Sequence, residues 1–520
     1  MKTLEQMSLR EKLGQMFITG FPSTTISEEM IDVIKNYHVG NMIVFSHNVE
    51  NKRQLSKLVR DLQQHFVSSN GIPGFITIDQ EGGRVVRMPE DATNVPGAMA
   101  IASTGRPENA YAAGRITARE LKAIGINFNL APVFDINNNP LNPVINIRSY
   151  GDKAEKVNEY GIQMMRGLLE GGVMSSLKHF PGHGDTNVDS HLGLPSIDKT
   201  LEQLEEVELV PFKEAIAQGA RGIMSAHILF PQIEKSGLPG TMSRTIITDL
   251  LKGKLGYTGL VVSDCLEMNA IKEYYGTAKG AVGALKAGID LICISHSPLI
   301  VKDAIDEIEA AIAAGEIDVA IVDNAVANIL AHKALYAPIE EHDVDVVGNS
   351  VHQAASMAIR TESISLVDGQ VKPVAKGSQD VCVIGSLSYR TDLASSSVNT
   401  GLSFAKQVAE KLQVANFVCD ISPSDDEIDA LLEQVKGYKH IVLGLFNARE
   451  NTGQLNLANK LIATGVDVTL VALGRPFDLA LIEGATASLT LLEYSKPAFE
   501  SIVPILSGEI KPTGTLPIAL

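Results

Sequence analysis

The sequence predicts an α/β protein that consists of a TIM-type (β/α)8 barrel followed by a smaller parallel α/β sandwich domain. Eight short apolar runs alternate with helical patterns between residues 14 and 297, and most of these runs end in polar residues. Five further apolar runs follow between residues 381 and 494. Apolar strands that alternate with helices form parallel sheets whose faces are covered by those helices.

Eight strands of this kind within about 300 residues fit a (β/α)8 barrel. Each run is followed by a turn or loop and then by a helical pattern such as EEMIDVIKNYH. The predicted strands are GQMFITGF (14–21), NMIVFSHN (41–48), GFITIDQE (74–81), FNLAPVFD (128–135), VMSSLKHF (173–180), GIMSAHIL (222–229), GLVVSDCL (259–266) and DLICISHS (290–297).

We expect residues 1–335 to form the barrel, residues 336–365 a linker with a connecting helix, and residues 366–520 the C-terminal domain. The second domain has no GxGxxG after its first strand, where GSLSYR stands instead, so dinucleotide binding is not expected. Its predicted strands are VCVIGSL (381–387), FVCDI (417–421), HIVLGLF (440–446), DVTLVALG (467–474) and SLTLLEY (488–494).

Charge and composition restrict the partners of the protein. A formal net charge of −17 argues against nucleic acid or an anionic membrane as the main partner. The chain has no apolar run long enough to span a membrane, and MKTLEQMSLREKLGQMF lacks the apolar core of a secretory signal. The four cysteines are scattered through apolar runs, so we expect free thiols in a cytoplasmic protein. The oligomeric state stays open.

The polar residues at the ends of the barrel strands are expected to meet at one face. In a (β/α)8 barrel the carboxyl ends of the strands converge, and active sites are built there. These residues are His47, Asp79, Glu81, Asp135, Lys178, His179, His227, Asp264 and His296.

Asp264 is a candidate nucleophile because it ends the seventh apolar run, GLVVSDCL. A carboxylate at a strand end is held by the most rigid part of the scaffold, as a nucleophile must be. The alternative is that Asp264 caps the next helix, since Ser263 and Glu267 complete a sequence that resembles a cap.

The segment KHFPGHGDTNVDSHLGLP (178–195) concentrates ionisable residues outside any helix or strand pattern. Asp189 and His191 are two residues apart, so in an extended segment their side chains leave on the same face. An aspartate can fix the tautomer of a histidine, and the pair can then shuttle protons near neutral pH. Lys178 and His179 belong to the strand end and suit hydrogen bonding to substrate hydroxyls.

The same segment offers a possible metal site as a rival interpretation. Its nitrogen and oxygen donors are suitable ligands, but Pro181-Gly182 prevents a helical His-x-x-x-His arrangement and no cysteine assists. We therefore expect no metal and no other cofactor, and we expect His183 and Asp185 to tie the loop to itself.

A sugar subsite is predicted around DQEGGRVVR and NIRSYG. Asp79 ends the third strand, and Gly82-Gly83 permits a tight loop that turns Arg84 and Arg87 back toward this strand end. Arg148 lies in an asparagine-rich loop. A carboxylate that accepts hydrogen bonds from vicinal hydroxyls, flanked by arginines, is typical of sugar binding.

Together these motifs resemble glycoside hydrolase family 3, and in particular its bacterial β-N-acetylglucosaminidase branch. The segments that carry the resemblance are MSLREKLGQM, DQEGGRVVR, NFNLAPVFDI, NIRSYG, KHFPGHGDTNVDSHLGLP, GLVVSDCLEM and, at the end of the chain, GTLPIAL. The resemblance implies a retaining, two-step hydrolysis that releases terminal N-acetylglucosamine from peptidoglycan-derived or related glycosides. It also implies a nucleophile, Asp264, and an acid/base, His191, that is paired with Asp189. The sugar-binding positions it implies are Asp79, Arg87, Arg148, Lys178 and His179.

Three alternatives stay open at this point. The chain could be a phosphorylase that uses the same residues, or a β-glucosidase or β-xylosidase of the same family. A catalytically silent sugar-binding protein on this scaffold is disfavoured by the intact Asp264 and His191. Many family members take the acid/base glutamate from the second domain, where Glu450 in GLFNARENTG could stand, but the complete Asp-Ser-His motif favours His191.

Overall fold

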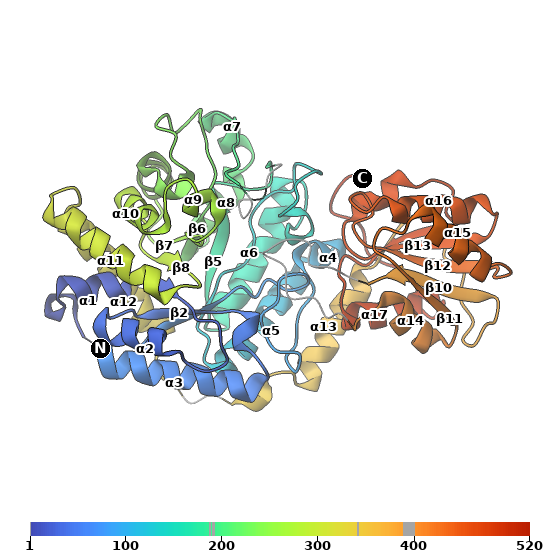
Figure 1. Cartoon of the computed structure of the whole chain (residues 1–520), viewed down its shortest axis with the longest axis horizontal. Helices are drawn as coiled ribbons and strands as arrows, with labels where there is room; N and C mark the ends of the chain where they lie inside the picture. The colour runs from blue at the N-terminus through green and yellow to red at the C-terminus, as the bar shows by residue number, and fades with distance from the viewer. Residues whose placement is uncertain (1, 187–188, 190–192, 341–342, 388–400) are drawn as a thin grey trace.

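The computed structural model describes residues 2–186, 189, 193–340, 343–387 and 401–520. Two sheets organise these residues (Figure 1). An eight-stranded parallel sheet has the order β7-β6-β5-β4-β3-β2-β1-β8, and the bridge between Val262 and Leu291 joins its two ends into a barrel. A six-stranded sheet forms the second unit. The predicted barrel is therefore confirmed.

The eight barrel strands are short, and every residue in them is buried. Burial on both faces explains why they appear in the sequence as continuous apolar runs. They are β1 (Phe17–Thr19), β2 (Asn41–Val44), β3 (Phe75–Ile78), β4 (Phe128–Asn129), β5 (Met174–Phe180), β6 (Gly222–Ser225), β7 (Leu260–Ser263) and β8 (Ile292–Ile294).

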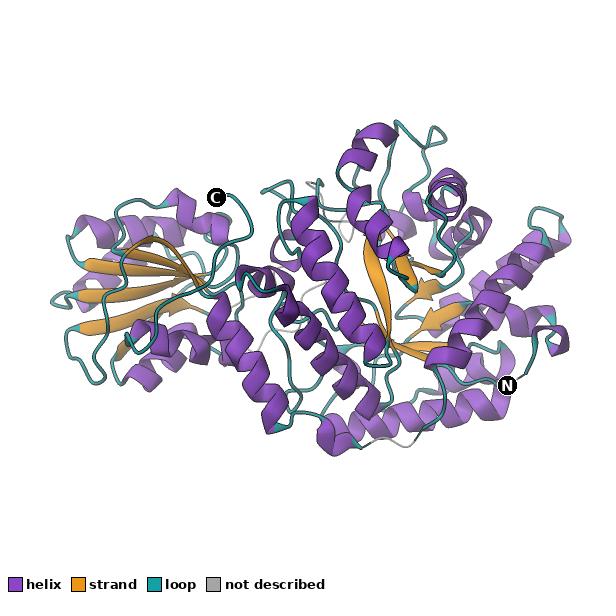
Figure 2. Ribbon diagram, turned by 180° about the vertical axis from the view of Figure 1, so that it is seen from behind, coloured by secondary structure: helices purple, strands orange, loops and turns teal. Residues whose placement is uncertain are grey.

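Helices surround the barrel and pack their apolar stripes against one continuous core (Figure 2). The first of them begins with the capping box seen in the sequence, because Ser8 and Glu11 exchange backbone and side-chain hydrogen bonds. The helices are α1 (Leu9–Gln15), α2 (Glu28–Asn36), α3 (Lys52–Asn70), α4 (Ala98–Ser103), α5 (Pro107–Ile124), α6 (Ala154–Glu170), α7 (Leu201–Glu206), α8 (Leu209–Ala217), a π-helix (Thr245–Lys254), α9 (Asn269–Lys272), α10 (Thr277–Ala287), α11 (Pro298–Ala313) and α12 (Val319–Tyr336).

The second sheet has the order β11-β10-β12-β13-β14-β9. The five predicted strands are present and parallel, and the predicted α/β sandwich is confirmed. A sixth strand, β9, which was not predicted, pairs antiparallel with β14 at the edge, so the sheet is mixed. Most of β9 is exposed, which explains why it has no apolar run. The strands are β9 (Ser365–Gly369), β10 (Val381–Ser386), β11 (Ala415–Cys419), β12 (His440–Leu445), β13 (Asp467–Ala472) and β14 (Ala487–Thr490).

The second sheet is a middle layer between two helix layers, each with its own apolar core. One layer consists of α14 (Phe404–Leu412) and α17 (Lys496–Leu506), and the other of α15 (Asp425–Gln434) and α16 (Gly453–Ala463). Helix α13 (Ser350–Ser363) connects the barrel to this domain (Figure 1). The domain boundaries near residues 335 and 366 stay a prediction. No helix in the described part of the chain is long and apolar enough to cross a membrane.

Candidate active site

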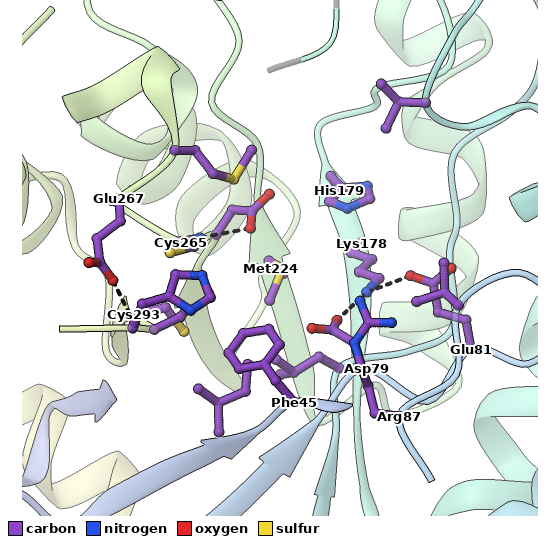
Figure 3. A pocket seen from close by; sticks show the side chains of 18 of the residues that line it. Phe45, Asp79, Glu81, Arg87, Lys178, His179, Met224, Cys265, Glu267 and Cys293 are labelled. Atoms are coloured by element: carbon purple, nitrogen blue, oxygen red, sulfur yellow. Dashed lines mark hydrogen bonds and ion pairs between the residues drawn. The ribbon is translucent and has the colours of Figure 1, made fainter. Parts of the chain in front are cut away.

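A cavity of about 530 Å³ opens at the carboxyl ends of the barrel strands (Figure 3). Side chains from the ends of β2, β3, β5, β6, β7 and β8 line it, together with loop residues. Six of the eight residues predicted for the site lie in its wall: Asp79, Arg87, Arg148, Lys178, His179 and Asp264. The convergence of strand ends thus brings together residues that are up to 185 positions apart in the chain, from Asp79 to Asp264.

Asp264 follows β7 directly and is half-buried. Its Oδ1 atom accepts a hydrogen bond of 2.7 Å from the backbone N–H of Cys265, and its own N–H donates to the carbonyl oxygen of Ser225 on the neighbouring strand. Helix α9 begins only at Asn269 and is preceded by Met268, so Asp264 does not cap it. The carboxylate is therefore fixed by the strand end and faces the cavity.

A cluster of four charged residues forms the opposite wall. The ammonium group of Lys178 lies 2.6 Å from Asp79 Oδ1 and 2.7 Å from Glu81 Oε1, and Figure 3 shows it between these two carboxylates. Arg148 donates through Nε and Nη2 to the two oxygens of Glu81, at 2.9 and 2.8 Å. The side chains of Glu81, Lys178 and Arg148 are at most 7% exposed, whereas Asp79 is 21% exposed.

The charges in this cluster depend on one another. Burial alone would raise the pKa of Glu81, but Arg148 and Lys178 outweigh burial and hold that pKa well below its ordinary value. Burial likewise disfavours the charged form of Lys178, and the carboxylates of Asp79 and Glu81 reverse this and raise its pKa. The wall is therefore ionised, and Asp79 is its most accessible carboxylate.

Asp135 is a buried carboxylate that organises the end of β5. Its Oδ2 atom lies 2.7 Å from Nδ1 of His179, and its Oδ1 atom accepts the backbone N–H of His183 at 2.7 Å. A carboxylate against Nδ1 fixes that nitrogen as the donor, which leaves Nε2 of His179 free to act as an acceptor. Burial, followed by the neighbouring His179, lowers the pKa of His183 to about 4, so His183 is neutral near pH 7.

The remaining ionisable residues of the 178–195 segment have separate partners. His183 contacts Thr186 within the segment, at 2.8 Å, as expected. Asp185 instead pairs with Lys199, which lies beyond the segment, so the prediction that it ties the loop to itself was wrong. Asp189 is buried, and its charge offsets a small part of the lowering that burial and two arginines impose on the pKa of Arg84. His191, the predicted acid/base, lies outside the described residues.

The loop after β3 turns tightly, as the two glycines predict. Gly82 and Gly83 have φ of 94° and 56°, which favours glycine, and a bridge joins Gly82 to Val85. Gln80 then accepts the backbone N–H of Arg87 at 2.8 Å, which brings the Arg87 side chain to the cavity. Burial, followed by Arg148 and Arg475, lowers the pKa of Arg84 to about 9.

An aromatic wall, Phe45, His47 and His296, completes the cavity on the side of β2 and β8. The rings of Phe45 and His296 lie 4.7 Å apart, and those of Phe45 and His47 lie 5.5 Å apart. Glu267 accepts the backbone N–H of His296 at 2.6 Å and so fixes the position of this wall. The sequence predicts no role for Phe45, and it indicates Glu267 only as part of a possible helix cap.

Two rival interpretations concern a metal site and Glu450 as the acid/base. Among the described residues, no three histidine, cysteine, aspartate or glutamate side chains are grouped so that they could hold a metal ion. Glu450 of the second domain is paired with Arg475 and does not line the cavity. The four cysteines are free thiols.

Comparisons with known proteins agree with this geometry. Residues 8–332 match the family model described as the glycosyl hydrolase family 3 N terminal domain. A beta-hexosaminidase A from Pseudoalteromonas piscicida is 38% identical over 299 residues, which are 54% of this chain and 50% of that protein. A beta-hexosaminidase from Alkalilimnicola ehrlichii is 34% identical over 292 residues, which are 55% of this chain and 82% of that protein.

A solved structure is similar along the whole chain. It is a glycoside hydrolase family 3 beta-N-acetylglucosaminidase from Paenibacillus sp. str. FPU-7, with 36% sequence identity and a TM-score of 0.92. The match covers 99% of each chain, so it includes both sheets. By contrast, this chain spans only about half the length of the Pseudoalteromonas relative.

Proposed function

Since the chain belongs to glycoside hydrolase family 3, we propose that it is a retaining exo-β-N-acetylglucosaminidase that forms a covalent glycosyl-enzyme at Asp264. The observation that carries this proposal is the position of Asp264, which faces the ionised cluster of Asp79, Lys178 and Glu81 in one cavity. The similarity to a beta-N-acetylglucosaminidase along the whole chain supports the choice of sugar.

In the first step the Asp264 carboxylate attacks the anomeric carbon, and a glycosyl ester of Asp264 forms as the leaving group departs. The hydrogen bond from Cys265 N–H to Oδ1 holds the carboxylate in one orientation. In the second step water cleaves the ester with net retention of configuration. A half-buried carboxylate at a rigid strand end suits this role because its position does not change between the two steps.

His191 is the proposed acid/base, and Asp189 is its partner. His191 protonates the leaving oxygen in the first step, and in the second step the neutral imidazole deprotonates water. The aspartate stabilises the imidazolium, which is present before the first step and forms again in the second. Most retaining glycosidases use a second carboxylate here, and a His–Asp pair performs the same proton transfers near neutral pH.

The opposite wall is proposed to bind the sugar hydroxyls. Asp79 accepts hydrogen bonds from vicinal hydroxyls of the sugar. Lys178, which lies between the carboxylates of Asp79 and Glu81, donates a hydrogen bond to a sugar hydroxyl. His179 presents Nε2 because Nδ1 is engaged by Asp135. Arg87 and Arg148 complete the wall. A cavity of about 530 Å³ takes the terminal sugar of a chain, which fits exo action.

The biological substrate is proposed to be a peptidoglycan-derived fragment with terminal N-acetylglucosamine, so the enzyme would act in cell-wall recycling. The proposed location is the cytoplasm. Free thiols at all four cysteines support a reducing compartment, because oxidising compartments favour disulfides.

The test compares wild type with Asp264→Asn on a panel of aryl β-glycosides, with and without phosphate. We expect wild type to cleave the N-acetylglucosaminide in preference to the glucoside and xyloside, and to release free N-acetylglucosamine. Loss of the nucleophile should reduce kcat by about 10⁴-fold or more. Near-normal turnover by Asp264→Asn would refute the mechanism. Release of a sugar 1-phosphate only when phosphate is added would identify a phosphorylase instead.

A further inference from the structure

The loop between β4 and α6, residues 130–153, here called the β4 loop, is held by the second domain at both polar and apolar points. Arg475, which follows β13, donates from Nη2 to the carbonyl oxygen of Pro143 at 3.3 Å. Near the end of the β4 loop, the backbone N–H of Ala519 donates to Asp152 at 3.0 Å. These contacts join residues more than 300 positions apart in the sequence.

Apolar packing connects the same two segments. Ile147 of the β4 loop belongs to a buried cluster with Leu492 and Ile518 of the second domain. Gly151 packs closely against Pro517 of the second domain: a Cβ added at Gly151 would lie 2.8 Å from the carbonyl oxygen of Pro517. The second domain thus contacts the β4 loop from Pro143 to Asp152, and a loop with such contacts has little freedom to move.

On its inner side the β4 loop holds the start of the segment that carries the proposed acid/base. The side chain of Asn142 is fully buried, and its Nδ2 atom lies 2.9 Å from the carbonyl oxygens of both His183 and Gly184. Its Oδ1 atom accepts the backbone N–H groups of Val144 and Ile145, at 2.9 and 2.8 Å. One amide therefore fastens the β4 loop and residues 183–184 to each other.

Backbone contact reinforces this junction. An added Cβ at Gly184 would lie 1.6 Å from the carbonyl oxygen of Ile136, so the two segments touch without an intervening side chain. Thr186 Oγ1 also lies 3.3 Å from Asn142 Nδ2. Two residues separate Thr186 from the candidate catalytic residue Asp189.

We infer that Asn142 is a positioning residue for the acid/base segment, and that the second domain supports it by fixing the β4 loop through Arg475. Only an amide can donate to two carbonyl oxygens and accept two N–H groups at this point. The inference rests on the proposed function, because it requires that His191 protonates the leaving group. It gives the second domain a role in catalysis although Glu450 does not line the cavity.

The experiment measures kcat/KM for two substrates, 2,4-dinitrophenyl and phenyl β-N-acetylglucosaminide. kcat/KM reports the first step, in which the bond to the leaving group breaks. Dinitrophenolate leaves without a proton, whereas phenolate needs the acid, and general acid catalysis contributes about 10²–10⁴-fold. A displaced acid therefore affects only the phenyl substrate. We expect Asn142→Ala to reduce kcat/KM for the phenyl glycoside at least about tenfold more than for the dinitrophenyl glycoside.

Arg475→Ala should change the same ratio in the same direction by a smaller factor, and it keeps the test informative if Asn142→Ala fails to fold. The matched control is Arg449→Ala, which removes an exposed arginine from the same domain and should leave the ratio unchanged. Thermal unfolding of each variant separates folding from positioning, since a loss of folded protein lowers both substrates equally.

The outcomes separate the two levels of the proposal. If wild type is active and Asn142→Ala has the same ratio of kcat/KM values for the two substrates as wild type, the inference is overturned but the proposed function is not. An unchanged ratio in a folded Arg475→Ala variant would overturn the part that concerns the second domain. A wild type that cleaves neither substrate would overturn the proposed function, and this inference with it.

Discussion

At the scale of single residues, Glu81 connects two cations of the cavity wall. Its carboxylate binds Lys178 at 2.7 Å and both donors of Arg148, and all three side chains are buried. Removal of one partner from a buried ion pair leaves an uncompensated charge and costs about 3–5 kcal/mol. We expect Glu81→Gln to lower the free energy of unfolding by about this amount and to raise KM for an aryl N-acetylglucosaminide roughly tenfold.

Urea unfolding and steady-state kinetics on the same preparation check both effects of Glu81→Gln. The control is Glu108→Gln, since the pair of Glu108 and Arg106 is exposed. Exposed pairs contribute little to stability, so the free energy of unfolding of this variant should stay close to that of wild type. If both variants lost the same stability, the burial argument for Glu81 would be wrong.

The lowered pKa of the buried His183 predicts that the free energy of unfolding depends on pH. Burial and His179 lower its pKa from 6.5 to about 4, so the unfolded chain takes up a proton at a pH where the folded protein does not. The stability linked to this residue is therefore fully present above pH 6.5 and is lost as the pH falls toward 4. Each unit of pKa difference corresponds to about 1.4 kcal/mol.

The measurement compares the free energy of unfolding at about pH 7.5 and about pH 4.5 for wild type and His183→Gln. The nearby Asp135 and His179 are present in both proteins, so the difference between the two proteins isolates the contribution of His183. Wild type should lose about 2–3 kcal/mol more than the variant between these conditions. Parallel losses in the two proteins would contradict the assignment.

At the scale of elements, the sequence predicts strand existence well and strand ends poorly. The run NMIVFSHN predicts a strand over residues 41–48, but β2 stops at Val44. The side chain of Asn48 accepts the backbone N–H of Phe45 and so begins a turn there. A local side-chain hydrogen bond of this kind competes with the sheet, and apolar patterning does not detect it. The exposed strand β9 is missed for the related reason that it lacks an apolar face.

In the candidate site, too, the sequence predicts some features and not others. Asp79, Lys178 and Asp264 could be predicted because each ends a buried strand, and strand ends converge in a barrel. The hydrogen-bond and ion-pair partners of the site residues could not be predicted from the sequence. Glu81 pairs with Arg148, which lies 67 positions later in the chain, and Asp135 pairs with His179, which lies 44 positions later. A single sequence does not show such long-range pairs. The roles assigned to all eight site residues stay a prediction, and His191 lies outside the described residues.

At the scale of the whole molecule, helix α13 connects the two sheets through one buried ion pair. Arg360 of α13 donates to both oxygens of Glu493, which follows β14, at 3.1 Å each, and both side chains are buried. The same guanidinium donates to the carbonyl oxygen of Asn94 in the barrel. Arg360 thus contacts both domains, and the pair couples the stability of the second domain to that of the barrel.

A double-mutant cycle tests this coupling. Arg360→Met and Glu493→Gln each leave one buried partner without its countercharge, and we expect each to cost about 3–5 kcal/mol. The double variant leaves neither charge, so its loss should be well below the sum of the two single losses. Urea unfolding followed by circular dichroism gives the three values. If the losses simply added, the two residues would act independently, and the connection between the domains would depend on apolar packing such as that of Ile147 and Leu492.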